Sequence, residues 1–372
     1  MQHFRLTTSL CLIAALQLSV TCAAESLVVG RSLPLTGPLS SYGEAKRDGA
    51  DAYIQKINLA GGVVGKQIEL VTLDDAYAPA TTVSNLKKIA AERSPVAFLG
   101  LFGVPTVAAA LPVMEELKIP SIGLTSGTDE LRVPFKKYAF PVRASYGDEA
   151  RKLVGHVKTV NISKINVIYS ENPFGESVKS SLVVALKDAG ITANVFKVDA
   201  AATQAAAAAK LAIADNPQAI FLTMLSQAAV PVLGEVRKAA FSGALYTFSP
   251  VDTSVVTKKL GKTASGLVIS QIVPIPKGIR LKVVSEYIQA LKDLGRGAPS
   301  FYGLEAFIEA KVLVEGLKRA GTKPSPSSLV QGLETMREFD LGGYFVNYSA
   351  SAHAGSNFVE VDVIDGSGEV MR

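Results

Sequence analysis

Short apolar runs typical of buried strands alternate along this chain with segments whose apolar residues recur at helical spacing. Four such runs come first, separated by helical patterns, and they lie at 26–33, 67–74, 96–101 and 119–124. In the first helical pattern Tyr53, Ile54 and Ile57 share one face, and Gly61-Gly62 ends it. A chain that alternates in this way builds βαβ units and a parallel sheet.

The alternation restarts after about residue 160 and produces a second set of similar size. Its strand-like runs lie at 164–170, 192–198, 219–224, 244–249 and 266–274. Three helical patterns then follow one another, at 279–295, 301–320 and 325–336. Alternating apolar and acidic residues at 358–363 indicate an antiparallel pair at the end of the chain. The sequence therefore predicts an α/β protein with two doubly wound parallel-sheet lobes.

The composition agrees with two lobes and argues against nucleic-acid binding. The chain has 372 residues, enough for two domains of roughly 100–200 residues each. Hydrophobic residues make up 48% and aromatic residues only 7%, which suits a core of Ala, Val, Leu and Ile around parallel sheets. The formal charge is +5, but the basic residues are scattered and interleaved with acids. This distribution indicates a solvated surface, and no nucleic-acid partner is expected.

Residues 1–24 have the pattern of a secretory signal peptide: one arginine near the start, an apolar stretch and small residues at the end. Cys22 and Ala24 take the −3 and −1 positions, so we expect cleavage after Ala24 and a periplasmic location. Lipid attachment at Cys22 is the alternative, although the residues before it make a poor attachment box. Both cysteines, Cys11 and Cys22, lie in this segment, which excludes disulfides, thiolate metal sites and a cysteine nucleophile from the mature chain.

Signals for an enzyme are weak. The mature chain has two histidines, His156 and His353, and they offer no metal-ligand spacing. The run "GLTSGTDE" departs from a G-x-S-x-G nucleophile elbow at Thr125, and no glycine-rich nucleotide-binding loop occurs. Asp74 and Asp75 are adjacent on a strand end and point to opposite faces, so we expect a helix cap there. We therefore expect no enzymatic activity, no cofactor and no metal.

The carboxyl ends of the strands carry the most informative residues, because open α/β sheets bind ligands in the crevice there. The segments that follow the strands are rich in small, hydroxylated and aromatic residues, and they read "LTGPLSSYG", "FGVPT", "LTSGTDE", "SENPFGES" and "FSPVDTS". Free N–H groups at helix starts bind anions, carboxylates in particular. Each Ser or Thr can also be read as a simple helix cap, but Tyr42, Phe102 and Phe174 are harder to explain in this way.

Long stretches of the chain resemble the solute-binding proteins of ABC transporters, in the leucine/isoleucine/valine-binding branch. The resemblance is carried by "LPLTGPLSSYGEAKRDGADAYIQKINLAGGVVGKQIELVTLDD", "FLGLFGVPTVAAALPVMEELKIPSIG", "FPVRASYGDEAR", "VIYSENPFGES" and "FYGLEAFIEAKVLVEGLKRAG". It implies a type I periplasmic-binding fold, in which three crossovers join two lobes that close on a ligand. The crossovers are expected near 143–147, 272–276 and 337–343. The first lobe would then hold 25–143 plus 275–338, and the second 144–274 plus 339–372.

The same resemblance implies which residues contact the ligand. Tyr42 matches an aromatic that touches the ligand side chain, and Phe174 stands where a tyrosine often covers it. Two loops of the first lobe match loops that bind a carboxylate, and Tyr146 follows at the first crossover. The loop residues are Phe102, Gly103, Val104, Thr106, Thr125, Ser126 and Gly127.

Three positions depart from the branched-chain amino-acid pattern. Gly103-Val104 replaces a usual serine, and Leu225 stands at a position that is often tyrosine. The 249–252 loop usually carries an acid for the ligand ammonium, and here the nearest acid is Asp252. A buried ammonium without a carboxylate partner is costly. An aromatic or aliphatic carboxylate, or an amide-like compound, therefore competes with an amino acid as the expected ligand.

These observations predict a monomeric, exported protein that captures a small-molecule solute and delivers it to an inner-membrane ABC permease. The alternative is a sensory module of the same fold that presents its ligand to a receptor or regulatory system. An enzyme on the same fold is a third hypothesis, which the missing cysteine and the sparse histidines disfavour.

Overall fold

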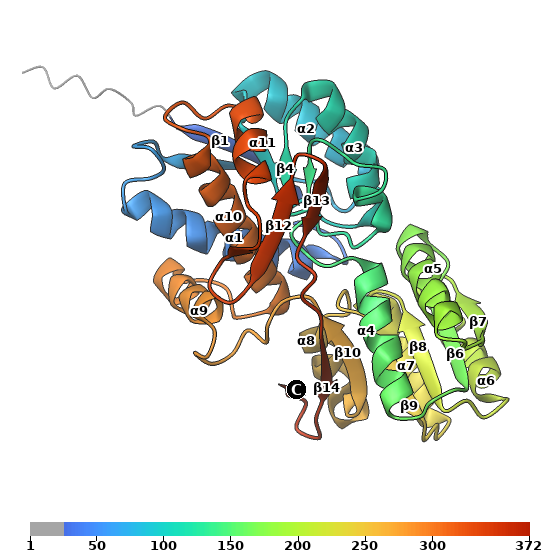
Figure 1. Ribbon diagram of the computed structural model, residues 1–372. Helices are drawn as coiled ribbons and strands as arrows, with labels where there is room; N and C mark the ends of the chain where they lie inside the picture. The colour runs from blue at the N-terminus through green and yellow to red at the C-terminus, as the bar shows by residue number, and fades with distance from the viewer. Residues whose placement is uncertain (1–25) are drawn as a thin grey trace, which may run out of the picture.

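The computed structural model describes residues 26–372 as two α/β lobes, and the chain passes between them three times (Figure 1). The predicted signal peptide, its cleavage site and Cys22 lie outside the described residues. In the described range, none of the helices has the length and apolar character needed to cross a membrane.

The first lobe is built on a five-stranded parallel sheet with the order β2-β1-β3-β4-β5. Its strands are β1 (Leu27–Leu33), β2 (Ile68–Asp74), β3 (Ala97–Leu99), β4 (Ser121–Ile122) and β5 (Ala139–Phe140). The helices between them are α1 (Ser40–Leu59), α2 (Pro79–Arg93), α3 (Val104–Leu117) and the 3-10 turn η1 (Asp129–Leu131). Strand follows helix as the sequence predicted, because the apolar side chains of both elements are buried against each other.

The second lobe holds a seven-stranded sheet with the order β15-β14-β10-β9-β8-β6-β7. Its parallel strands are β6 (Ile165–Ser170), β7 (Ala193–Val198), β8 (Ala219–Thr223), β9 (Ala244–Thr247) and β10 (Leu267–Gln271). The helices are α4 (Tyr146–Thr159), α5 (Pro173–Asp188), α6 (Ala205–Ile213), α7 (Ser226–Lys238), α8 (Thr253–Leu260) and the 3-10 turn η2 (Gly261–Ala264). The last strands, β14 (Glu360–Ile364) and β15 (Val370–Met371), form the predicted antiparallel pair at one edge.

The three late helices return to the first lobe, as the resemblance implied. They are α9 (Lys282–Leu294), α10 (Phe301–Arg319) and α11 (Pro326–Glu334). Most residues of α10 are buried, because this helix lies along α1 and joins the core of the first lobe. The predicted fold class, two doubly wound lobes, is confirmed.

The boundary of the third crossover differs from the expectation. Residues 339–355 form a small antiparallel sheet on the first lobe, made of β11 (Phe339–Asp340), β12 (Phe345–Ser349) and β13 (Ala352–Gly355). Tyr348 is fully buried there against Phe140 of β5, at 5.4 Å between ring centroids. The chain reaches the second lobe only after residue 355, so the predicted crossover near 337–343 was placed too early.

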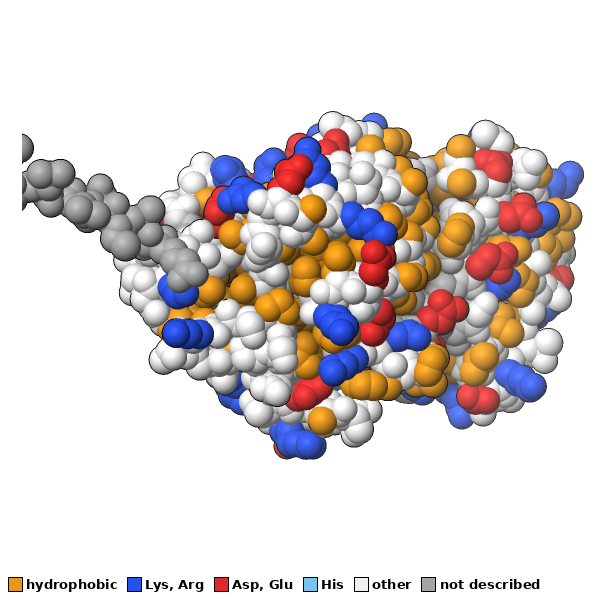
Figure 2. Space-filling view, turned by 90° about the horizontal axis from the view of Figure 1, so that it is seen from above, with side chains coloured by type: hydrophobic (Ala, Val, Ile, Leu, Met, Phe, Trp, Pro, Cys, Tyr) orange, Lys and Arg blue, Asp and Glu red, His pale blue; other side chains and the backbone are white. Residues whose placement is uncertain are grey.

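Lys, Arg, Asp and Glu side chains are mixed over the face seen in Figure 2 rather than separated by sign. This distribution is the one that the scattered charges of the sequence indicated.

Gly49 and Gly303 let α1 and α10 approach each other closely. A Cβ added at Gly49 would lie 2.0 Å from the carbonyl oxygen of Gly303. We therefore expect Gly49→Ala to lower the free energy of unfolding by about 1–3 kcal/mol, since the helices must move apart. The control is Gly155→Ala on α4, where the new Cβ meets nothing within 4 Å. Helix propensity should make that variant up to about 1 kcal/mol more stable. If the close contact were unimportant, thermal unfolding would show a similar gain in Gly49→Ala.

Candidate ligand-binding site

The carboxyl-terminal ends of the strands in the two lobes face each other, and Tyr42 makes the most direct contact between them. Tyr42 lies in the first turn of α1 and is fully buried. Its hydroxyl donates a hydrogen bond of 2.7 Å to Ser226 Oγ, at the start of α7 in the second lobe. Tyr302, at the start of α10, donates to the Pro250 carbonyl at 3.0 Å. Two phenols of the first lobe therefore hold loops of the second.

Four aromatic rings form a cluster at this contact: Tyr42, Tyr77, Phe102 and Tyr302. The ring centroid of Tyr42 lies 4.8 Å from that of Tyr302 and 5.4 Å from that of Phe102. Tyr77 lies edge-on to Phe102 at 5.9 Å. Burial raises the pKa of the Tyr42 phenol, so this hydroxyl remains a neutral donor across the physiological pH range. The cluster forms an apolar wall between the lobes.

The predicted 102–106 loop lies beside this wall. Gly103 has φ +95°, and a Cβ there would lie 2.2 Å from the Tyr77 ring. This close approach gives a physical reason for glycine where the resemblance led us to expect serine. Val104 begins α3 and packs with Phe174 in a core cluster of the second lobe. The Thr106 hydroxyl donates to carbonyls of its own turn, those of Phe102 and Gly103.

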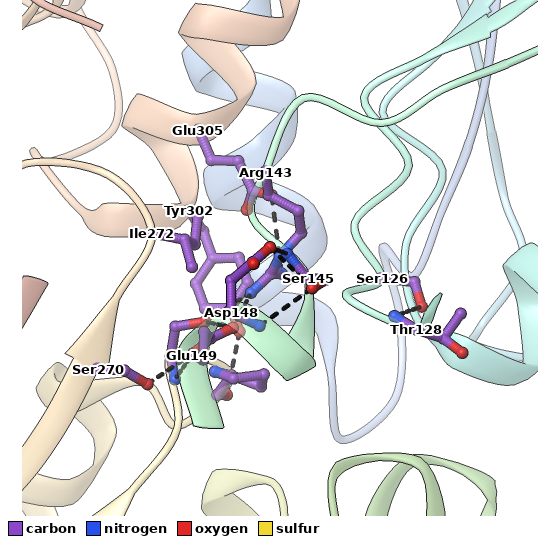
Figure 3. A network of polar contacts seen from close by, with 12 residues as sticks. Ser126, Thr128, Arg143, Ser145, Asp148, Glu149, Ser270, Ile272, Tyr302 and Glu305 are labelled. Carbon is purple, nitrogen blue, oxygen red and sulfur yellow. Dashed lines mark hydrogen bonds and ion pairs between the residues drawn. The ribbon is translucent and has the colours of Figure 1, made fainter. Parts of the chain in front are cut away.

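The second predicted loop, 125–127, lies next to the first. Thr125 bridges to Phe102, and its hydroxyl lies 3.4 Å from Glu309 Oε1. Ser126 Oγ accepts from the backbone N–H of Thr128 at 3.4 Å (Figure 3). Gly127 packs against the Tyr146 ring so closely that a Cβ would lie 2.5 Å from it.

Two predicted residues meet on the second-lobe side. Tyr146 opens α4, and its ring lies edge-on to Phe174 at 5.8 Å between centroids. Phe174 is 5% exposed and stands at the start of α5, which Asn172 caps. Both rings belong to the core cluster that also holds Val104, so this part of the contact is apolar.

The structure places Asp252 at the start of α8. Its carboxylate accepts hydrogen bonds from the N–H of Ser254 at 2.9 Å and from the Ser254 hydroxyl at 2.6 Å. Asp252 is thus the N-cap of α8. The Asp252 carboxylate is hydrogen-bonded at the start of α8. Within the described residues, no hydrogen bond joins it to the aromatic wall.

The residue motifs did not reveal a buried charge cluster that consists of Lys46, Arg143, Glu149, Glu305 and Glu309. All five residues are at most 2% exposed. The Arg143 guanidinium, at the first crossover, lies 2.5 Å from Ser249 Oγ. It also lies 3.4 Å from Glu149 Oε1 and 3.7 Å from Glu305 Oε1 (Figure 3). The cluster therefore joins α1 and α10 of the first lobe to α4 and the 249–252 loop of the second.

The ion pairs of this cluster are close and supported by hydroxyl groups. Lys46 Nζ lies 2.9 Å from both carboxylate oxygens of Glu309 and 3.8 Å from Glu305 Oε2. Glu149 accepts from the Ser270 hydroxyl at 2.6 Å and from the Ser249 N–H at 3.0 Å. The two acids of α10 stand four residues apart among apolar residues, and this spacing was the available sequence signal.

The cluster contains three carboxyls and two cations, so one carboxyl is protonated when the charges balance. Burial raises the pKa of Glu309 to about 8, although Lys46 opposes the rise. Burial also raises the pKa of Glu149. Burial disfavours the charge on Arg143, but Glu305, Tyr146 and Glu149 outweigh this effect and raise its pKa. We therefore place the proton on a carboxyl.

This raised pKa makes stability depend on pH in one direction. Between the ordinary pKa of 4.5 and about 8, folded Glu309 binds a proton that the unfolded chain does not. Its contribution to stability consequently falls as the pH rises through this window and is constant above it. We expect Glu309→Gln to flatten the decline of Tm between about pH 5 and pH 8 relative to the native protein. Calorimetry at several pH values tests this, with Glu315→Gln on the same helix as control; equal slopes in all three proteins would contradict it.

A small cavity, the junction cavity, lies where the cluster meets the aromatic wall. Its volume is about 10 Å³, and it is lined by Arg143, Ser249, Gln271, Ile272, Phe301, Tyr302 and Glu305. Tyr302 separates it from the loops that carry the predicted ligand contacts, since the same ring packs on Tyr42 and Phe102. The site thus combines an apolar wall with a deeply buried polar end.

Comparison with known proteins gives a consistent result. The family model described as periplasmic binding protein matches residues 26–363. The chain is 23% identical over 321 residues to a Pseudomonas aeruginosa protein named "Amino acid binding protein", covering 85% of this chain and 84% of that one. It is 24% identical over 333 residues to the leucine-, isoleucine-, valine-, threonine- and alanine-binding protein of the same species, with the same two coverages.

Solved structures show the same fold. The crystal structure of a substrate-binding periplasmic protein from Ralstonia solanacearum superimposes with a TM-score of 0.86 at 28% identity, covering 93% of this chain and 99% of that one. An extracellular ligand-binding receptor from Verminephrobacter eiseniae gives a TM-score of 0.87 at 28% identity, covering 94% and 100%. The resemblance stated from the sequence is confirmed: this chain belongs to the periplasmic binding protein family of solute-binding proteins.

Proposed function

We propose that this protein is the periplasmic receptor of an ABC importer, which captures a small organic solute between its lobes and delivers it to an inner-membrane permease. The observation that carries the proposal is the contact of Tyr42 and Tyr302 with Ser226 and Pro250. These contacts join loops of opposite lobes at the place where open α/β sheets bind ligands. A solute that touches both lobes favours their closed arrangement.

The class of solute is an amino acid or an aromatic or aliphatic carboxylate. The names of two relatives, which refer to amino acids, favour the first. The apolar wall suits the body of either class. Tyr42 and Phe174 would contact that body from opposite lobes, and the N–H groups of the 102–106 and 125–127 loops would lie near its polar part. The exported protein acts as a monomer in this proposal, and the solute leaves it chemically unchanged.

A thermal-shift screen of residues 25–372 tests the proposal. The panel contains L-leucine, L-isoleucine, L-valine, L-threonine, L-alanine, benzoate, phenylacetate, hexanoate and succinate. A ligand at 100 times its Kd should stabilise the protein by about 2.7 kcal/mol. Mass spectrometry of the recovered ligand checks that it is unchanged. Absence of any shift, with folded and ligand-free protein, would count against solute capture of this class.

Uptake of the radiolabelled ligand by cells with and without this gene distinguishes import from sensing. Loss of uptake in the deletion strain supports the permease partner. Unchanged uptake together with tight binding would instead favour the sensory module.

A further inference from the structure

We infer that the junction cavity is the subsite for the charged head of an amino acid, with Glu305 accepting from its ammonium group and Gln271 and Arg143 donating to its carboxylate. This inference rests on the proposed function and narrows the solute to one class. It also assigns the head group to residues outside the loops that the family resemblance indicated.

Three residues that line this cavity each have one buried polar atom without a hydrogen-bond partner: Arg143 Nε, Gln271 Nε2 and Glu305 Oε1. These residues are only 1–2% exposed. Glu305 Oε1 has only the longer ion pair of 3.7 Å with Arg143. Buried polar groups are almost always hydrogen-bonded, so three such atoms in the residues around one cavity indicate that a ligand or water completes them. Two are N–H donors and one is a carboxylate oxygen, which matches the carboxylate and the ammonium of a zwitterion.

The three groups come from parts of the chain that move relative to one another when the lobes close. Arg143 lies in the first crossover, Gln271 ends β10 before the second, and Glu305 lies on α10 of the first lobe. A head group held by all three therefore contacts both lobes and a crossover at once. Such contacts form as the lobes approach each other around the head group, and they favour that arrangement over the open one.

The loops that the resemblance assigned to the head group lack the necessary side chains. Gly103 and Val104 offer no hydroxyl, the Thr106 hydroxyl donates within its own turn, and Asp252 caps α8. An ammonium group buried without a carboxylate would be too costly to bind tightly. Glu305 supplies that carboxylate from a different element.

Charge and size are also consistent with a zwitterion. With one carboxyl protonated the buried charge cluster is neutral, and a neutral zwitterion leaves it so. The cavity of about 10 Å³ holds about one water molecule. The head group consequently enters while the lobes are apart. With the head group bound, the lobes close less far than in this structure, and Tyr302 does not reach the Pro250 carbonyl.

The experiment pairs ligand analogues with variants and measures Kd by isothermal titration. For L-leucine the analogues are 4-methylpentanoate, which lacks the ammonium group, and 3-methylbutylamine, which lacks the carboxylate. We expect Glu305→Gln to weaken L-leucine roughly 100-fold or more and to leave 4-methylpentanoate within about threefold of its native Kd. Gln271→Leu should weaken L-leucine roughly tenfold and leave 3-methylbutylamine unchanged. A merely structural role would weaken all three ligands alike.

Asp252→Asn is the rival variant, because asparagine preserves the helix cap while it removes the charge. Loss of L-leucine binding in Asp252→Asn with full binding in Glu305→Gln would overturn the inference and leave the proposed function intact. Equal binding of L-leucine and 4-methylpentanoate by the native protein would also overturn the inference. So would normal binding of L-leucine by both Glu305→Gln and Gln271→Leu, because only water would then fill the cavity. If no amino acid binds the native protein, the amino-acid form of the proposed function fails first. If an analogue binds too weakly to measure, the Kd values of Glu305→Gln and Asp252→Asn for L-leucine decide which acid holds the ammonium group.

Discussion

Replacing Arg143 with methionine should lower the free energy of unfolding by roughly 3–5 kcal/mol, which is the usual cost of removing one partner from a buried ion pair. Arg143 is 2% exposed and is the cation nearest to Glu149, and it also faces Glu305. Methionine fills much of the same volume as arginine. The loss of stability therefore measures the missing charge and not an empty cavity. The two carboxyls would be left without this cation in a buried site.

The expected loss depends on pH and has a matched control. Without Arg143 the pKa of Glu149, which burial already raises, rises further, so protonation at low pH should restore part of the lost stability. The control is Arg151→Met on α4, whose side chain is 66% exposed beside Asp148. That change should alter stability by less than about 1 kcal/mol. Calorimetric Tm values of the three proteins at acidic and neutral pH are the measurement, and a loss in Arg143→Met no larger than in the control would refute the role of the cluster.

Replacing Tyr42 with alanine should weaken ligand binding by roughly 2–4 kcal/mol, a factor of roughly 30 to 1,000 in Kd. The ring is a central part of the aromatic wall and is fully buried between the lobes. Tyr42→Phe keeps the ring and removes only the hydrogen bond to Ser226, so we expect a smaller loss of about 0.5–1.5 kcal/mol. The ligand that gives the largest thermal shift serves as the probe, with Kd measured by titration.

The control for these variants is Tyr53→Phe on the same helix. Tyr53 packs against Phe307 inside the first lobe, at 5.0 Å between ring centroids. Its replacement should leave ligand affinity unchanged. Small-angle scattering adds a second readout, since loss of the Tyr42 hydroxyl should favour the more open arrangement of the lobes. Unaltered affinity in Tyr42→Ala would show that the solute binds elsewhere.

Local patterns were sufficient to predict most of the helices and strands. The alternation of strands and helices predicted both sheets because each parallel strand is a short apolar run with a helical pattern after it. The loops around Tyr42, 102–106 and 125–127 were identified because they follow strand ends, and the structure brings them together. Whether they hold the solute remains a prediction.

The parts that sequence reasoning missed depend on contacts between distant segments. The segment 339–355 packs on the first lobe through contacts such as that of Tyr348 with Phe140, and its local sequence does not say which lobe buries it. Lys46 and Glu309 are 263 residues apart in the chain, and no local pattern pairs them. Asp252 was the nearest acid in its loop, but a side chain just before a helix competes for the free N–H groups of that helix.

The late crossovers determine when this protein can fold. The first lobe needs α10 beside α1, and the second needs β14 beside β10, so both lobes depend on residues beyond 300. A chain that emerges N-terminus first, from a ribosome or from a translocation channel, cannot complete either lobe until nearly all of it has emerged. Both lobes are therefore completed late, and contacts that need both of them, such as that of Tyr42 with Ser226, form last.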